Sequence, residues 1–178
     1  MTIASVLTVA CIPQFFPPGT LKDVDHNFDF TQWRLSPNSV GDNHKVQLGG
    51  RIVQSQRKDD TLTLVAAHLP IVEHPAYGPK ETGKSHALFT ILYKGTLDPL
   101  FLHKGNRFIV VGHTSPETLV EVDDVLRSLP TITAQCLHIW QTGDHEIADS
   151  QSSGAGYPVL REDTYCGGKR PWSPLGYF

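Results

Sequence analysis

An alternation of apolar and polar residues over 61–66 constrains the fold of this chain more than any other feature. Leu62, Leu64 and Ala66 recur at every second position. This period of two places the three side chains on one face of an extended segment, which is typical of a β-strand with one buried face. A polar turn precedes this segment, and residues 46–53 before the turn also have the composition of a strand. We therefore predict that the two strands form a β-hairpin.

The first strand of this hairpin is interrupted by two glycines. Val46, Leu48 and Ile52 share one face, and Gly49 and Gly50 stand between them. Glycines inside a strand mark a bulge or the bend of a barrel, because they allow backbone conformations and close approaches that other residues do not. We expect one of these two features here.

Three more strands are expected, over 87–93, 107–112 and 132–140. The last of them has alternate residues on one face: Ile132, Ala134, Cys136, His138 and Trp140. Between the last two strands, Pro116 and apolar residues at helical spacing predict a short helix over 115–129. The 15 glycines and 13 prolines favour turns and short strands over long helices. The chain is thus expected to be all-β, a small five- to six-stranded Greek-key or OB-like barrel with at most one or two short helices.

The rest of the chain flanks this barrel. Residues 1–10 are a short apolar segment that looks like a truncated lipoprotein signal, and residues 11–38 are expected to be a proline-rich tether. The barrel is expected over 39–142, followed by a C-terminal tail over 143–178 that is rich in Gly, Ser, Pro and aromatic residues. A flexible tether of about 26 residues would reach about 28 Å on average.

Cys11 stands directly behind the apolar segment and is a candidate lipidation site. Bacterial lipoprotein signals end in Leu-x-(Ala/Gly)-Cys, and this cysteine becomes the lipidated first residue. Ala10 fits this motif, whereas Thr8 takes the place of the usual leucine. Such signals also begin with basic residues, which are missing after Met1, so we expect the true initiator to lie upstream. The alternative is an apolar N-terminal strand with an inert, buried cysteine.

Charge and composition argue against several classes of partner. A net charge of -3 gives no long-range attraction to nucleic acid, so no nucleic-acid partner is expected. No apolar run approaches the ~18–20 residues of a membrane-spanning helix. The three cysteines have no C-x-x-C pairing and the nine histidines have no ligand spacing. We therefore expect no metal and no cofactor.

Several short motifs lie in a fixed order along the middle of the chain. They are the strand at 46–53, Thr-Leu-x-Leu at 61–64, Leu-Asp-Pro at 97–99, the strand at 108–112, and Ile-Trp at 139–140. With Cys11 in front of them, the chain resembles the Slp family, the starvation-inducible outer-membrane lipoproteins of Gram-negative bacteria. The resemblance implies an outer-membrane lipoprotein of envelope or stress physiology with no established enzyme activity. Ile12 also differs from the Asp that marks inner-membrane retention in such lipoproteins.

Cys136 and His138 have the residue types of a nucleophile and its base. Residues two apart on a strand are ~6.6 Å apart, which is too far for a direct hydrogen bond. The apolar neighbours of Cys136 favour a buried structural cysteine. A disulfide between Cys136 and Cys166 would suit an oxidising periplasm once Cys11 carries lipid. Both alternatives remain open at this point.

Three aromatic residues are candidate binding groups. Phe89 and Tyr93 share one face of the third strand, where they would serve as a stacking platform of the kind that OB-folds use or as core residues. Trp172 belongs to the aromatic C-terminal tail. That tail would lie at a membrane interface or dock on the barrel or on a partner.

These observations lead to one expected function and two rivals. We expect a non-enzymatic lipoprotein, attached to the outer membrane by its lipid anchor with the barrel facing the periplasm, whose partner is an envelope protein or a small ligand. One rival is an OB-type binding module for a peptide, glycan or oligonucleotide, which needs an exposed aromatic patch. The other is a hydrolase built from residues such as His113, Asp144 and His145, which needs a cleft where polar groups converge.

Overall fold

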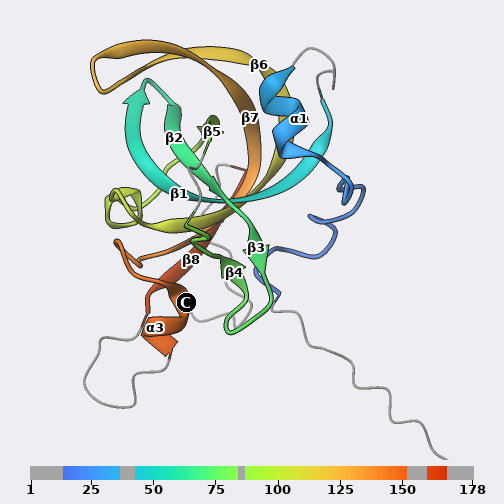
Figure 1. Ribbon diagram of the computed structural model, residues 1–178, viewed down its shortest axis with the longest axis vertical. Coiled ribbons are helices and arrows are strands. Elements are labelled where there is room, and N and C mark those ends of the chain that lie inside the picture. Colours follow the sequence, from blue (N-terminus) through green and yellow to red (C-terminus); the bar gives the residue numbers. More distant parts are fainter. Residues whose placement is uncertain (1–13, 37–42, 84–86, 152–159, 168–178) are drawn as a thin grey trace, which may run out of the picture.

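A computed structural model describes residues 14–36, 43–83, 87–151 and 160–167 of the chain (Figure 1). The strands in these residues are β1 (Lys45–Lys58), β2 (Thr61–Leu69), β3 (Ile71–Val72), β4 (Gly78–Pro79), β5 (Leu88–Lys94), β6 (Arg107–Val122), β7 (Val125–Trp140) and β8 (Glu162–Cys166). The helices are short: α1 (Phe30–Leu35), the 3-10 turn η1 (Pro99–Leu102) and α3 (Ile147–Gln151).

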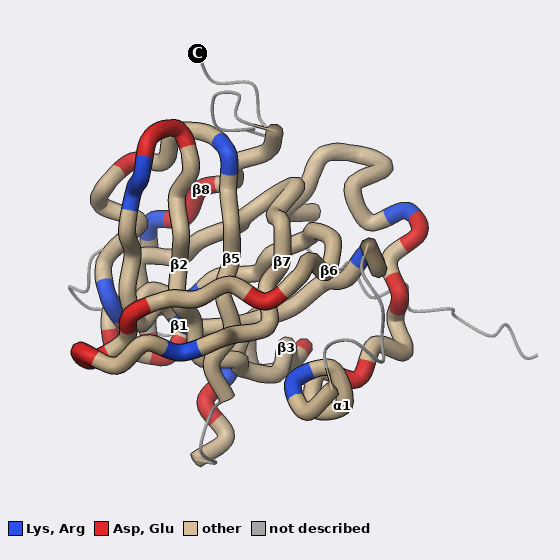
Figure 2. The backbone as a smooth tube through the Cα atoms, turned by 90° about the horizontal axis from the view of Figure 1, so that it is seen from above, with Lys and Arg blue, Asp and Glu red and all other residues tan. Residues whose placement is uncertain are grey.

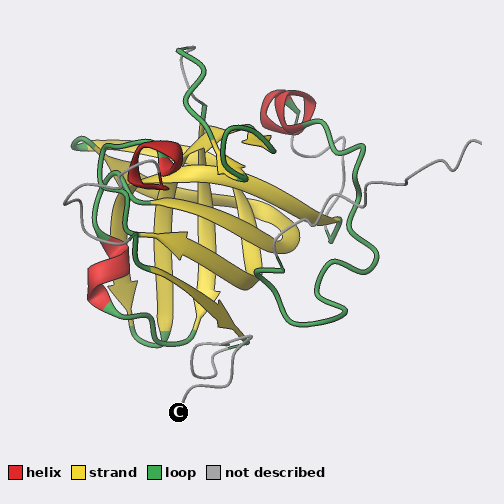
Figure 3. Ribbon diagram, turned by 90° about the horizontal axis from the view of Figure 1, so that it is seen from below, coloured by secondary structure: helices red, strands yellow, loops and turns green. Residues whose placement is uncertain are grey.

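Five of the strands close into a ring. The sheet order is β5-β2-β1-β6-β7-β8 with antiparallel neighbours, and β5 also pairs with β7 in parallel. Residues 131–133 of β7 pair with β5, and residues 136–140 pair with β8 farther along the same edge. Figure 1 looks into this ring, and Figure 3 shows its strands side by side. The prediction of an all-β chain whose strands close on themselves, with two short α-helices, is confirmed.

The main core fills the inside of the ring, and the predicted hairpin contributes much of it. Val46, Leu48 and Ile52 of β1 face inward together with Leu62 and Leu64 of β2, and all five side chains belong to one buried cluster. β1 and β2 pair antiparallel from Gly49 opposite Leu69 to Lys58 opposite Thr61, with one shift of register. The faces assigned from the period of two are therefore correct.

The bulge considered for Gly49 and Gly50 lies at a different residue of β1. The β1–β2 register shifts between Ile52 and Gln54, so the bulge is not at the glycines. Gly50 has another role: a Cβ atom there would lie 2.6 Å from Cζ of Phe108 and 2.9 Å from the Ala67 carbonyl oxygen. Glycine is needed because the Phe108 ring lies across this point of the backbone.

The helix predicted over 115–129 is wrong, because this stretch is the end of the long β6–β7 hairpin. The two strands pair as far as Val122 and Val125. Asp123 and Asp124 form the turn, with φ angles of 51° and 60°. Two positive φ angles in a two-residue loop match the twist of antiparallel strands, and Asp tolerates them. The apolar residues at helical spacing therefore divide between the two faces of a hairpin.

The single face predicted for 132–140 is split by a bulge. The β6–β7 register skips Gln135, and this extra residue reverses the direction of the side chains that follow. Ile132 and Ala134 face the main core, whereas Cys136 and Trp140 belong to a second cluster outside the ring.

The segments expected as tether and tail contribute to the fold. Within the described part of 11–38, the side chains of Phe16, Val24 and Trp33 are buried, the last with an exposed fraction of 1%. Within 143–178, β8 adds a strand to the edge of β7. The folded unit therefore extends beyond 39–142 on both sides. Isolated aromatic side chains that insert one at a time produce no period, so periodicity did not reveal them.

Candidate functional site

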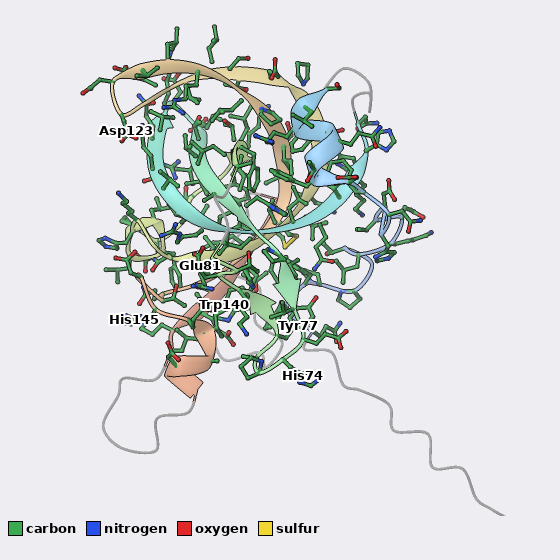
Figure 4. The ribbon with its side chains drawn as sticks, viewed as in Figure 1. His74, Tyr77, Glu81, Asp123, Trp140 and His145 are labelled. Carbon is green, nitrogen blue, oxygen red and sulfur yellow. A yellow bond between two sulfur atoms is a disulfide. The ribbon has the colours of Figure 1, made fainter. Side chains whose placement is uncertain are left out.

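A cluster of aromatic side chains joins the N-terminal segment to the outside of the ring. The Phe15 ring stacks on His138 with ring centroids 4.2 Å apart and an interplanar angle of 25°. The Phe15 ring also makes an edge contact with Trp140 and a tilted contact with Tyr77, with ring centroids 5.2 and 5.7 Å apart. We call these four residues the aromatic cluster. β7 supplies two of them and the β3–β4 hairpin supplies Tyr77, so three distant segments meet here (Figure 4).

Hydrogen bonds fix the orientation of His138 within this cluster. Thr164 Oγ1 donates to the carbonyl oxygen of Phe15 at 2.9 Å. A hydroxyl has one proton, so the same oxygen accepts from His138 Nδ1, 2.7 Å away. Neutral His138 therefore carries its proton on Nδ1, which leaves Nε2 as a bare acceptor. Nε2 is buried without a hydrogen-bond partner, 3.5 Å from Glu162 Oε2.

The electrostatics of this pair follow from burial. Desolvation lowers the pKa of His138 below its ordinary value, and the negative charge of the nearby Glu162 carboxylate opposes that effect only in part. The interaction with His138 in turn lowers the pKa of the Glu162 carboxyl. Near neutral pH the ring is therefore uncharged and the carboxylate ionised. The basic nitrogen Nε2 points into the protein, so it is poorly placed to take a proton from a bound substrate.

Cys136 and Cys166 lie opposite each other in the β7–β8 register, with Cα atoms 4.2 Å apart. Their sulfur atoms form a disulfide, so in this structure neither is a free thiol nucleophile. Cys136 is buried beneath Thr20, whose Oγ1 lies 3.9 Å from the sulfur. The disulfide therefore ties β8 to β7 close to the N-terminal segment that contains Thr20.

A buried ion pair holds the neighbouring elements in place. Arg107 on β6 donates from both terminal nitrogens to Glu146, at 2.7 and 2.5 Å, and Nη1 also donates to the Pro79 carbonyl at 2.7 Å. The Arg107 side chain is 3% exposed and that of Glu146 is 30% exposed. These charge-assisted bonds connect the ring to β4 and to the residue before α3.

Of the two interpretations of Phe89 and Tyr93, the surface binding platform is wrong and the core position is correct. Both side chains have an exposed fraction of 0%. They lie on the inner face of β5, where Phe89 packs against Phe30 and Phe108 with centroid distances of 5.6 and 6.3 Å. In a closed ring, every second residue of a strand points into the core, so Phe89 and Tyr93 share a face because both pack inside. Two other predicted site residues, Cys11 and Trp172, lie outside the described residues.

The residues considered for a hydrolase do not converge. His113 pairs with Thr133, six residues along β6 from Arg107, which pairs with Trp140. At the rise of a strand this is about 20 Å, and Asp144 and His145 follow Trp140. Among the described residues no group of His, Cys, Asp and Glu could hold a metal ion. Figure 2 shows that charges of both signs are interspersed over the described residues.

Sequence reasoning missed several residues of this region. Phe15 and Phe16 stand in a proline-rich segment that was expected to be a tether. Two adjacent aromatic residues in such a segment are a signal of docking, because a free linker has no need of apolar bulk. No comparable signal exists for Thr164 and Glu162, since their roles depend on the register of β8.

Comparison with known proteins places this architecture in a family. The family model of the outer membrane lipoprotein Slp family matches residues 8–172. The chain belongs to the Slp family. The match confirms the resemblance drawn from the motifs between 46 and 140, and it extends to Cys11 and to the residues of the aromatic cluster. No curated protein and no solved structure matches the chain significantly. In the described part of this Slp-family chain, no helix is long and apolar enough to cross a membrane.

Proposed function

We propose that this Slp-family protein is a non-enzymatic outer-membrane lipoprotein, anchored by lipid on Cys11, whose β domain faces the periplasm and serves envelope or stress physiology. The observation that carries the proposal is the family match, which begins at residue 8 and so includes Cys11. Ile12 in place of Asp agrees with sorting to the outer membrane. Two or more acyl chains on one cysteine give stable anchoring, at about 0.8 kcal/mol per buried CH₂.

The structure supports the non-enzymatic part of the proposal through its reactive groups. The sulfur of Cys136 is bonded to Cys166, and Nε2 of His138 is buried. Arg107 donates to Glu146 and to the Pro79 carbonyl, so the two charges of this pair are already engaged within the fold. These side chains stabilise the packing of segments. A disulfide also fits an oxidising compartment such as the periplasm.

Intact-mass analysis of the membrane fraction tests the anchor. The protein is expressed in a Gram-negative host behind a lipoprotein signal, and we expect a diacylglycerol-sized addition plus an amide-linked acyl chain on Cys11. Cys11→Ser should release the protein into the soluble periplasmic fraction. The matched control, Cys136→Ser with Cys166→Ser, removes two other cysteines and should leave the protein in the membrane. Absence of the acyl mass from Cys11 would overturn the proposal.

Protease access tests the periplasmic face. The β6–β7 hairpin tip carries Leu119 and Leu126 at 66% exposure each, so it offers an accessible cleavage site. We expect no cleavage in intact cells and cleavage after the outer membrane is made permeable. Cleavage in intact cells would place the domain on the outer surface.

A further inference from the structure

The chain that leads to Cys11 emerges from a fixed point on the β domain. The Phe15 carbonyl accepts a hydrogen bond from Thr164, and the Phe15 ring stacks on His138. Phe16, the next residue, is 4% exposed in the same apolar cluster. The domain therefore holds the segment at Phe15, and only four residue steps separate Phe15 from Cys11.

This short connection limits how far the domain can move from its anchor. Four residues span at most about 14 Å when fully extended, at about 3.6 Å each. A free tether of 26 residues would instead average about 28 Å and would allow the domain to rotate. The docking of Phe15 thus replaces a long flexible tether by a short one with a defined point of attachment.

The elements around that point form one end of the molecule. Ile71 and Tyr77 of the β3–β4 hairpin and Ile147 of α3 pack in the same apolar cluster as Phe15. Figure 4 shows Tyr77, His74 and Trp140 at this end and Asp123, in the turn of the β6–β7 hairpin, at the opposite end. Hydrogen bonds from Arg107 to the Pro79 carbonyl and to Glu146 connect β4 and the residue before α3 to the ring.

We propose that the lipid headgroup surface lies against the end formed by the β3–β4 hairpin and α3, while the β6–β7 hairpin points away from the membrane. The inference rests on the proposed lipidation of Cys11. Exposed residues at the membrane-facing end carry both signs of charge, such as Glu73 and Lys80. The orientation therefore depends on the short tether and needs no attraction to anionic lipid. In this orientation Leu119 and Leu126 face the aqueous compartment and are accessible to a binding partner.

Spin labels at the two ends test this orientation. Acylated protein, verified by intact mass, is placed in phosphatidylcholine vesicles that contain a small fraction of a nickel-chelating lipid. One variant carries the label at Glu73→Cys, in the exposed β3–β4 loop, and the other at Leu126→Cys, near the β6–β7 turn. We expect paramagnetic relaxation of the Glu73 label to be enhanced several-fold more than that of the Leu126 label. Equal enhancement, or a reversed order, would overturn the orientation.

A longer tether is the matched control, because it leaves the folded residues unchanged. An insertion of 20 Gly/Ser residues between Ile12 and Pro13 adds about 25 Å of average reach. The difference between the two labels should then disappear, whereas a difference that persists would show that the tether does not set the orientation. Missing acyl mass refutes lipidation and with it the orientation, whereas acyl mass with equal relaxation refutes the orientation alone.

Discussion

Phe15 and Thr164 are joined by a hydrogen bond of 2.9 Å although 149 positions separate them in the sequence. The bond runs from the Thr164 hydroxyl to the Phe15 carbonyl, and the same hydroxyl accepts from His138 Nδ1. One side chain of β8 therefore holds both the N-terminal segment and the central histidine of the aromatic cluster. Both ends of the described chain depend on this contact.

Thr164→Val should destabilise the protein by about 1–3 kcal/mol, because it keeps the shape of the side chain while leaving the buried His138 Nδ1 and the partly buried Phe15 carbonyl unpaired. Urea denaturation of the oxidised protein measures the loss. Thr31→Val, on the exposed side of α1, is the matched control and should change stability by at most about 0.5 kcal/mol. A similar effect of both substitutions would argue against the hydrogen-bonded network.

His138 should make stability depend on pH. Its pKa is lowered in the folded state by burial, so the unfolded chain binds a proton at a pH where the folded chain does not. The free energy of unfolding should therefore fall as the pH is lowered from about 7 to 5, by at most about 1.4 kcal/mol per pH unit. His138→Gln should show a shallower dependence in the same denaturation series. Parallel curves for the two proteins would contradict this assignment.

The Cys136–Cys166 disulfide closes a loop between residues 30 positions apart. Replacing both cysteines by alanine should lower the free energy of unfolding by about 3–4 kcal/mol, as expected for a loop of this length. Dithiothreitol should lower the stability of the wild type and leave that of the double variant unchanged. If dithiothreitol also destabilised the double variant, its effect on the wild type would not come from reduction of this disulfide.

The elements that could be predicted from the sequence are those with an uninterrupted period. The β1–β2 hairpin was predicted in detail, since Leu62, Leu64 and Ala66 alternate without a break. The β6–β7 hairpin was missed because its apolar residues also fit a helical spacing. Its signal was Asp123-Asp124, a pair that tolerates the positive φ of a tight turn.

The candidate site was less predictable, because long-range pairing builds it. One extra residue, Gln135, decides that Cys136 and His138 face away from the core, and no local pattern marks a bulge at that position. The partners of His138 come from β8 and from the N-terminal segment, 26 and 123 positions away. At Phe89 the sequence left a binding surface and a core position open, and the structure shows the core position. Burial depends on closure of the ring, which the sequence of β5 alone does not encode.

Two Arg–Glu pairs at the same end of the molecule allow a controlled test of the buried ion pair. Arg107 is almost fully buried and bonded through two nitrogens to Glu146, whereas the side chains of Arg51 and Glu81 are about one-third exposed and 4.0 Å apart. Glu146→Ala should cost about 2–4 kcal/mol, since it leaves a guanidinium buried without its counter-charge. Glu81→Ala should cost less than about 1 kcal/mol, as expected for a surface pair. Equal losses in urea denaturation would show that Glu146 is no more than a surface partner, and that β4 and α3 are held by apolar contacts instead.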